Sequence, residues 1–175
     1  MDTKITRAEL KRLQTLQEIC IETYTTFFGE YWVGNGLQMY LQDQFGTEKL
    51  TSDLNGNIIE YYFIERGEQV VGYLKINNEV SLNGFENKSC CELEKMYMYP
   101  DEQGGGIGSS AMHLLIEMLR KKHKDILFLE VLDTNDTAMH FYEKAGFVFH
   151  DKTKVKAPNF KPDLSGLHRM VMLLG

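Results

Sequence analysis

The segment D-E-Q-G-G-G-I-G-S-S-A, residues 101–111, constrains the fold more than any other feature of the chain. Its glycines follow a strand-like run, ELEKMYMYP, and precede a helix-like run, MHLLIEMLR. A strand that turns through glycines into a helix leaves backbone N–H groups free and directs the positive end of the helix at an anion. The segment therefore predicts a binding site for a phosphorylated ligand at a strand–helix junction.

The rest of the chain predicts one mixed α/β domain over residues 1–175. Apolar residues at helical spacing predict helices over 6–27, 36–45, 47–54, 107–119 and 136–145. Runs rich in β-formers predict strands over 57–65, 69–76, 91–100, 125–132, 147–155 and 168–174, with a loop or ragged hairpin over 77–89. Thr6 to Glu9 reads as a capping box, Asn135 as an N-cap, and Gly146 as a helix end. This order predicts a mixed sheet with helices on both sides.

Composition narrows the class of protein. The chain has a net charge of -6, which disfavours nucleic-acid binding as its main activity. It contains no apolar run of 18 residues and no apolar signal-peptide core, so we expect a cytoplasmic protein that does not enter a membrane. The three cysteines and five histidines show no metal-ligand spacing, and no metal is implied.

The charges are unevenly distributed. Residues 18–60 carry seven acids against one base, Lys49, whereas residues 144–169 carry six bases and two acids. The seven acids are Glu18, Glu22, Glu30, Asp43, Glu48, Asp53 and Glu60. Such segments are commonly solvated faces, and they are also able to form a wall for a cationic substrate and a seat for an anionic ligand.

Two nucleotide-binding motifs fit the glycines poorly. A Walker A loop needs a lysine directly after its last glycine, but Ser109 follows Gly108. The dinucleotide fingerprint is matched by Gly106, Gly108 and Ala111, with Glu130 near the expected ribose position. Three observations disfavour the dinucleotide fingerprint. The residues PDEQ separate the strand from the glycines, and the strand alternates polar and apolar residues. In addition, too little chain follows for a dinucleotide-binding domain.

A third motif fits two separate segments. Gln103 to Gly108 resembles the Q/R-x-x-G-x-G/A acyl-CoA loop of the GNAT family of N-acetyltransferases. Downstream, TNDTAMHFYEKAGF is similar to the family segment N-x-x-A-x-x-F-Y-x-K-x-G-F. The resemblance covers roughly residues 91–149. It implies a GNAT fold, whose central, mostly antiparallel sheet has about six to seven strands, and acetyl-CoA as the cosubstrate of an N-acetyltransferase.

The resemblance also implies roles for single residues. The residues that it places at acetyl-CoA are Tyr97, Met98, Gln103, Gly104, Gly105, Gly106, Ile107, Gly108, Ser109, Asn135 and Tyr142. The backbone N–H of Met98 is the implied oxyanion donor. Tyr142 lies on the apolar face of its helix, and a phenol with a pKa near ~10 is able to protonate the departing thiolate. The alternative for Tyr142 is packing.

An acceptor amine must lose a proton before it attacks, and two carboxylates are candidates for the base. Glu94 and Glu92 lie two residues apart on one predicted strand and so share a face. Each matches a position from which some family members relay a proton. A solvated strand face, with water alone as the base, is the alternative.

The acceptor is the least determined partner. The acid-rich segment and the stretches ETYTTFF, MYLQDQF and TEKLTSDL look like PaiA-type spermine/spermidine acetyltransferases, which implies a polyamine or another small cationic amine. Aromatic residues at 24, 27, 28, 31 and 32 either contact such a cation or form core. Acetylation of a peptide or protein amine and a non-catalytic acyl-CoA-binding regulator are the alternatives. A homodimer stays open.

Overall fold

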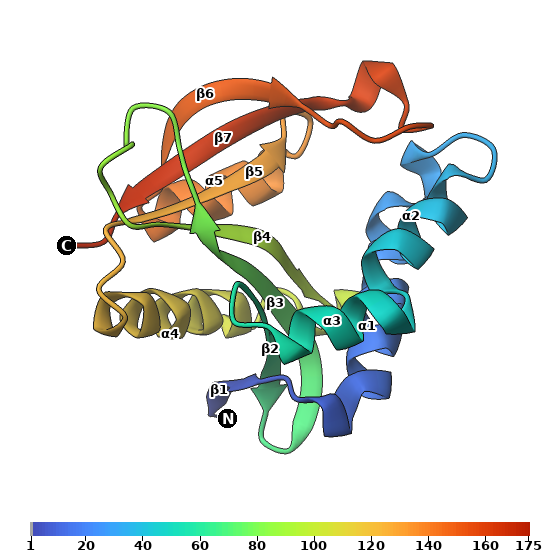
Figure 1. Cartoon of the computed structure of the whole chain (residues 1–175), viewed down its shortest axis with the longest axis horizontal. Coiled ribbons are helices and arrows are strands. Elements are labelled where there is room, and N and C mark those ends of the chain that lie inside the picture. The colour runs from blue at the N-terminus through green and yellow to red at the C-terminus, as the bar shows by residue number, and fades with distance from the viewer. Residues whose placement is uncertain (1) are drawn as a thin grey trace.

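The computed structural model describes residues 2–175, which form one seven-stranded sheet with helices on both faces (Figure 1). The strands are β1 (Thr3–Arg7), β2 (Ile59–Arg66), β3 (Gln69–Val80), β4 (Cys90–Met98), β5 (Ile126–Leu132), β6 (Val148–Lys154) and β7 (Gly166–Leu173). The helices are α1 (Leu13–Phe28), α2 (Gly36–Phe45), α3 (Thr47–Asn55), α4 (Ile107–Lys121) and α5 (Asp136–Ala145). The predicted mixed α/β class is confirmed.

The strand order is β1-β2-β3-β4-β5-β7-β6, and only β4 and β5 pair in parallel. Their ladder is short, running from Cys90 opposite Ile126 to Leu93 opposite Leu129. Beyond that point β4 continues to Met98 and β5 to Leu132, and the two strands no longer pair with each other. The C-terminal parts of β4 and β5 therefore separate, and a cleft opens between the two halves of the sheet.

Two helical layers cover the sheet. Helices α4 and α5 pack on one face, and α1, α2 and α3 pack on the other face beside β2, β3 and β4. In Figure 1 the N-terminal helices (blue to cyan) stand together on one side of the molecule, and β5, β6, β7 and α5 (orange to red) stand on the other. The cleft thus has one wall from the N-terminal helices and one from the C-terminal half.

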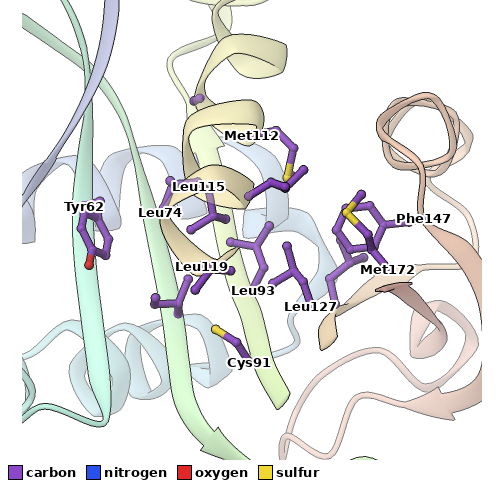
Figure 2. Close-up of a cluster of buried hydrophobic side chains, with 14 of the residues drawn as sticks. Tyr62, Leu74, Cys91, Leu93, Met112, Leu115, Leu119, Leu127, Phe147 and Met172 are labelled. Carbon is purple, nitrogen blue, oxygen red and sulfur yellow. The ribbon is translucent and has the colours of Figure 1, made fainter. Parts of the chain in front are cut away.

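The main core lies between α4 and the central strands. Figure 2 shows Met112, Leu115 and Leu119 of α4 directed at the strands, where Leu93 and Leu127 are buried. The helical apolar spacing predicted this face of α4, because side chains three and four residues apart project on one side of a helix. The packing fixes the beginning of α4, and with it the glycine segment.

The N-terminus differs from its prediction. Residues 3–7 form strand β1, which pairs with β2, and the first α-helix begins only at Leu13. The Thr6 hydroxyl donates to the carboxylate of Glu65, which also accepts from Arg12 at 2.8 Å, so Thr6 caps no helix. The backbone hydrogen bonds between β1 and β2, together with the buried Glu65 carboxylate, stabilise the strand more than a cap at Thr6 would stabilise a helix. Similarly, β3 extends to Val80 and takes in the start of the predicted 77–89 loop.

No helix within residues 2–175 has the length and apolar character needed to cross a membrane.

Candidate active site

The separation of β4 and β5 opens a cleft of about 1160 Å³. Its lining comes from β4, β5, the start of α4, helix α5, the segment around Lys154–Phe160, and aromatic residues of α1 and α2. Polar groups converge on an otherwise apolar and aromatic hollow, which is the usual composition of a small-molecule site. The cleft runs between the glycine segment and the N-terminal helices, and we expect the cosubstrate at the first end and the acceptor at the second, called the cosubstrate end and the acceptor end.

The glycine segment forms the cosubstrate end. Gly104 and Gly106 have φ of +84° and +79°, a left-handed conformation that favours glycine, and an added Cβ at either would meet nothing within 4 Å. The N–H of Ser110 donates to the Gly106 carbonyl at 3.0 Å. The three N–H groups before it, from Ile107 to Ser109, belong to the first turn, where helical N–H groups have no partner within the helix. Such a cradle suits a pyrophosphate.

Gly108 serves a different purpose. A Cβ there would lie 3.1 Å from the Met98 side chain, which is tighter than ordinary contact, and 3.6 Å from Phe141, at van der Waals distance. Glycine at this position lets the beginning of α4 approach β4 and α5 closely. The anion-binding end of the helix is therefore held at the mouth of the separation between β4 and β5.

The backbone of β4 supplies a donor inside the cleft. The N–H of Tyr99 donates to the carbonyl of Val71 at 3.0 Å, on the β3 side. Successive N–H groups of a strand point in opposite directions, so the N–H of Met98 points away from β3, toward the side where β5 has diverged. This orientation agrees with the predicted oxyanion donor.

Helix α5 forms the far wall. The side chain of Asn135 accepts from the N–H of Ala138 at 3.1 Å, and Gly146 ends the helix at φ +103°, so both predicted helix ends are confirmed. Tyr142 lines the cleft and packs against Phe141 and Phe147, with ring centroids 5.2 and 5.7 Å apart. Burial raises the pKa of Tyr142 to about 12, which keeps its hydroxyl protonated at neutral pH.

A β-bulge shapes the acceptor end. Lys75 of β3 opposes Lys95 of β4 and the next pair is Ile76 with Leu93, so Glu94 is an extra residue. Before the bulge Leu93 faces α4, and after it Met96 faces α4. The extra residue therefore places Glu94 and Lys95 together on the face toward the N-terminal helices.

The two carboxylates of β4 have different partners. Glu94 forms an ion pair with Lys75, whose side chain is 4% exposed. Within residues 2–175 the side chain of Glu92 makes no hydrogen bond or ion pair, and it lines the cleft. Burial, followed by the nearby charges of Glu94 and Glu130, raises the pKa of Glu92 to about 7. A carboxylate whose pKa lies near neutrality is well matched to general-base chemistry.

The cleft brings together most of the predicted site residues. Those that line it are Glu92, Glu94, Tyr97, Met98, Gln103, Gly104, Gly106, Gly108, Ser109, Asn135 and Tyr142. Gly105 is not among the lining residues, and the Ile107 side chain is buried in the core under α4, which leaves only its backbone for a ligand. Tyr97 faces α1, with its ring 5.5 Å from that of Phe28.

The acid-rich segment does not wall the cleft. None of its seven acids, all within the described part of the chain, lines it. Asp53, for example, pairs with Lys49, and Glu60 pairs with Lys122 on α4. The aromatic residues of the same segment do contribute, since Tyr24, Phe27, Phe28 and Tyr31 line the acceptor end. Both alternatives that the sequence left open are therefore decided: the acids lie outside the cleft lining, and four of the five aromatic residues line it, whereas Trp32 is buried in the core.

Several lining residues were not predicted. Lys95, Tyr40 and Gln44 lie together at the acceptor end, and Arg169 of β7 pairs with Glu130 at 2.9 Å. One signal for Lys95 was present in the sequence. In E-L-E-K-M-Y the alternation of polar and apolar residues breaks at the adjacent Glu94 and Lys95, as a bulge would require.

The fold and the cleft define a transferase that uses an acyl-CoA. The family model described as the acetyltransferase (GNAT) family matches residues 14–147, and the chain belongs to this family. It is therefore an acetyl-CoA-dependent N-acetyltransferase, as the sequence predicted. An uncharacterized N-acetyltransferase in the pepI 3′ region of Lactobacillus delbrueckii subsp. lactis is 26% identical over 143 residues, 82% of this chain and 83% of that protein.

Solved structures agree on the fold. The PaiA N-acetyltransferase of Thermoplasma acidophilum in complex with coenzyme A superimposes with a TM-score of 0.73, covering 97% of this chain and 98% of that one, at 17% identity. The spermidine/spermine N-acetyltransferase SpeG of Vibrio cholerae gives a TM-score of 0.68 at 16% identity, covering 98% and 92%. At these identities the likeness shows the GNAT fold.

Proposed function

We propose that the cleft transfers the acetyl group of acetyl-CoA to a small primary amine, by direct attack of the amine on the thioester through a tetrahedral intermediate. The observation that carries this proposal is that one cleft is lined by an unpaired, half-buried carboxylate, a backbone N–H on the open edge of β4 and a protonated phenol. Each group matches one requirement of acyl transfer.

Glu92 is the base. An alkyl ammonium, with a pKa near ~10, must lose a proton before its nitrogen attacks a carbonyl carbon. Glu92 lies in the cleft without a partner, whereas Glu94 is committed to Lys75. A carboxylate near neutrality accepts the proton, directly or through water, and such catalysis contributes about 10²- to 10⁴-fold in rate.

Met98 and Tyr142 act on the other side of the carbonyl. As the nitrogen bonds to the carbonyl carbon, negative charge moves to the oxygen, and the Met98 N–H on the open edge of β4 donates to it. When the carbon–sulfur bond breaks, the electron pair leaves with sulfur. The hydroxyl of Tyr142 then gives its proton to the thiolate, and the second proton that the acceptor nitrogen loses as the amide forms restores the phenol, directly or through water.

No covalent acetyl-enzyme is required. The free cysteines Cys20, Cys90 and Cys91 are all buried, and none lines the cleft within the described residues. The proposed residues instead supply separate groups for deprotonation, charge stabilisation and protonation.

Two acceptor classes have support. A polyamine is favoured by the fold shared with SpeG and by the aromatic wall, which suits a cation. The charges that line the cleft favour a second class, amines that also carry a carboxylate. The lining contains three acids and four bases, which are Lys95, Lys154, Lys156 and Arg169. Such a lining does not concentrate a polycation.

The test is CoA release by the purified protein with spermidine, 1,4-diaminobutane, amino acids and lysine-containing peptides, with each product identified by mass spectrometry. We expect acetylation of a small amine and little acetylation of peptides. Turnover on peptides alone would contradict a small acceptor. Tight CoA binding with no turnover on any amine would favour a non-catalytic regulator.

A further inference from the structure

Lys95 is a cation at the acceptor end of the cleft with no carboxylate partner. Its ammonium donates to the Tyr40 hydroxyl at 3.1 Å and lies 5.7 and 5.9 Å from the ring centroids of Tyr40 and Phe45. No acid among residues 2–175 forms an ion pair with it within 4.0 Å, as the nearby carboxylate of Glu94 is held by Lys75. An ammonium has three donors, and the described side chains use one of them.

An unpaired cation in this place is costly for the fold. Lys95 is half-buried, and burial lowers its pKa because removal from water disfavours the charged form. Buried charges in proteins are normally paired with an opposite charge or serve a functional site. Lys95, Tyr40 and Gln44 all line the cleft, and the Lys95 ammonium has two donors beyond the one that Tyr40 accepts.

We propose that Lys95 binds a carboxylate of the acceptor, and hence that the acceptor is a small amine that also carries a carboxylate, an amino acid or a close derivative. This rests on the proposed function of the cleft. Lys95 acts here as a specificity residue, and Tyr40 holds its ammonium in place.

With a zwitterionic acceptor, each of these charges at the acceptor end has a partner of opposite sign. Its carboxylate would meet Lys95, its ammonium would meet Glu92, and Glu94 already has Lys75. A polyamine leaves Lys95 unpaired and brings a second cation toward it, and like charges in a poorly solvated site repel strongly. The charge pattern therefore selects against the polyamine class.

The discriminating experiment compares acceptors that differ only in the carboxylate. Wild-type kcat/KM is measured for α-amino acids, 3-aminopropanoate and 4-aminobutanoate, each beside its carboxamide, and for 1,4-diaminobutane. We expect at least one acid to exceed its carboxamide by about 10- to 100-fold, the range of one charge-assisted hydrogen bond. The carboxamide of an α-amino acid has the more readily deprotonated amine, which biases this comparison against the proposal.

The variant Lys95→Met locates the effect. We expect it to lower kcat/KM for the preferred acid by about 10- to 100-fold, mainly through KM, and to leave the carboxamide within about 2-fold. Lys95→Arg should restore part of the loss. Lys88→Met, at an exposed lysine of the β3–β4 loop outside the cleft, is the matched control and should behave as wild type.

The outcomes separate this proposal from the function on which it rests. Wild-type protein that acetylates carboxamides or the diamine as well as any acid would overturn the role of Lys95 while the N-acetyltransferase stands, even if Lys95→Met fails to fold. Equal losses on acid and carboxamide in Lys95→Met would also overturn it. An absence of turnover on every amine would refute the proposed function itself.

Discussion

Glu92 couples the activity of this protein to its stability, and the substitution Glu92→Gln tests both. The carboxyl has its pKa raised from 4.5 to about 7, with burial as the largest cause. At 1.36 kcal/mol per pKa unit, this difference corresponds to about 3 kcal/mol. Glutamine keeps the shape of the side chain and removes the charge.

The sign of the stability effect follows from proton binding. Between pH 4.5 and about 7 the folded protein holds a proton on Glu92 that the unfolded chain has released, so the free energy of unfolding decreases as pH rises through this window. Above it the ionised carboxylate costs the fold up to about 3 kcal/mol. We expect Glu92→Gln to be more stable than wild type by about 1–3 kcal/mol at pH 8 and nearly equal to it at pH 4.5.

The effect on activity has the opposite direction. Wild-type kcat should rise with pH and level off above about pH 7, when Glu92 is ionised. Glu92→Gln should lose this inflection and about 10²- to 10⁴-fold in kcat.

Urea unfolding at the two pH values and kcat profiles from pH 5 to 9 measure these effects. Glu79→Gln, at an exposed position of β3, is the matched control and should change neither. The reasoning is refuted if Glu92→Gln keeps the inflection near pH 7, or if its stability difference is the same at both pH values.

Three further substitutions test other parts of the account. Tyr142→Phe should lower kcat about 10²-fold and leave the Kd for CoA unchanged by calorimetry, because only the hydroxyl is lost; an unchanged kcat would show that the tyrosine only packs. Gly106→Ala should weaken CoA binding about 10-fold, because the φ of +79° at this position strains any residue with a Cβ. The control is Gly67→Ala in the β2–β3 turn, where φ is +63°; it introduces similar strain and should leave CoA binding unchanged. Lys75→Met leaves Glu94 without its partner and should lower the free energy of unfolding at pH 7 by about 3 kcal/mol in urea; no loss would show that the ion pair contributes little.

The sequence alone was sufficient to predict the structural features that depend on neighbouring residues. Helix α5 begins at Asn135 and ends at Gly146, since a side-chain cap and a left-handed glycine act within one turn. The glycine segment and the apolar face of α4 were predicted for the same reason. These signals need only a few neighbouring residues.

Features set by distant partners were missed. The capping box at Thr6 gave way to pairing of β1 with β2, nearly 60 residues away in sequence. Among the acids of residues 18–60, Glu60 pairs with Lys122 of the distant helix α4, and Asp53 pairs with Lys49 one turn away. The bulge that turns Glu94 and Lys95 to one face depends on the register between β3 and β4, and the broken alternation of β4 alone does not establish that register.

The central claim is that amine acetylation occurs in the cleft between β4 and β5. The most direct measurement quantifies, in one reaction with the best acceptor amine, the CoA released and the N-acetyl product by mass spectrometry, for wild type and Glu92→Gln. The account predicts equal amounts of the two products in wild type, no release above background without the amine, and a loss of both in the variant. CoA release that is independent of amine, or an acetyl group retained on the protein, would contradict it.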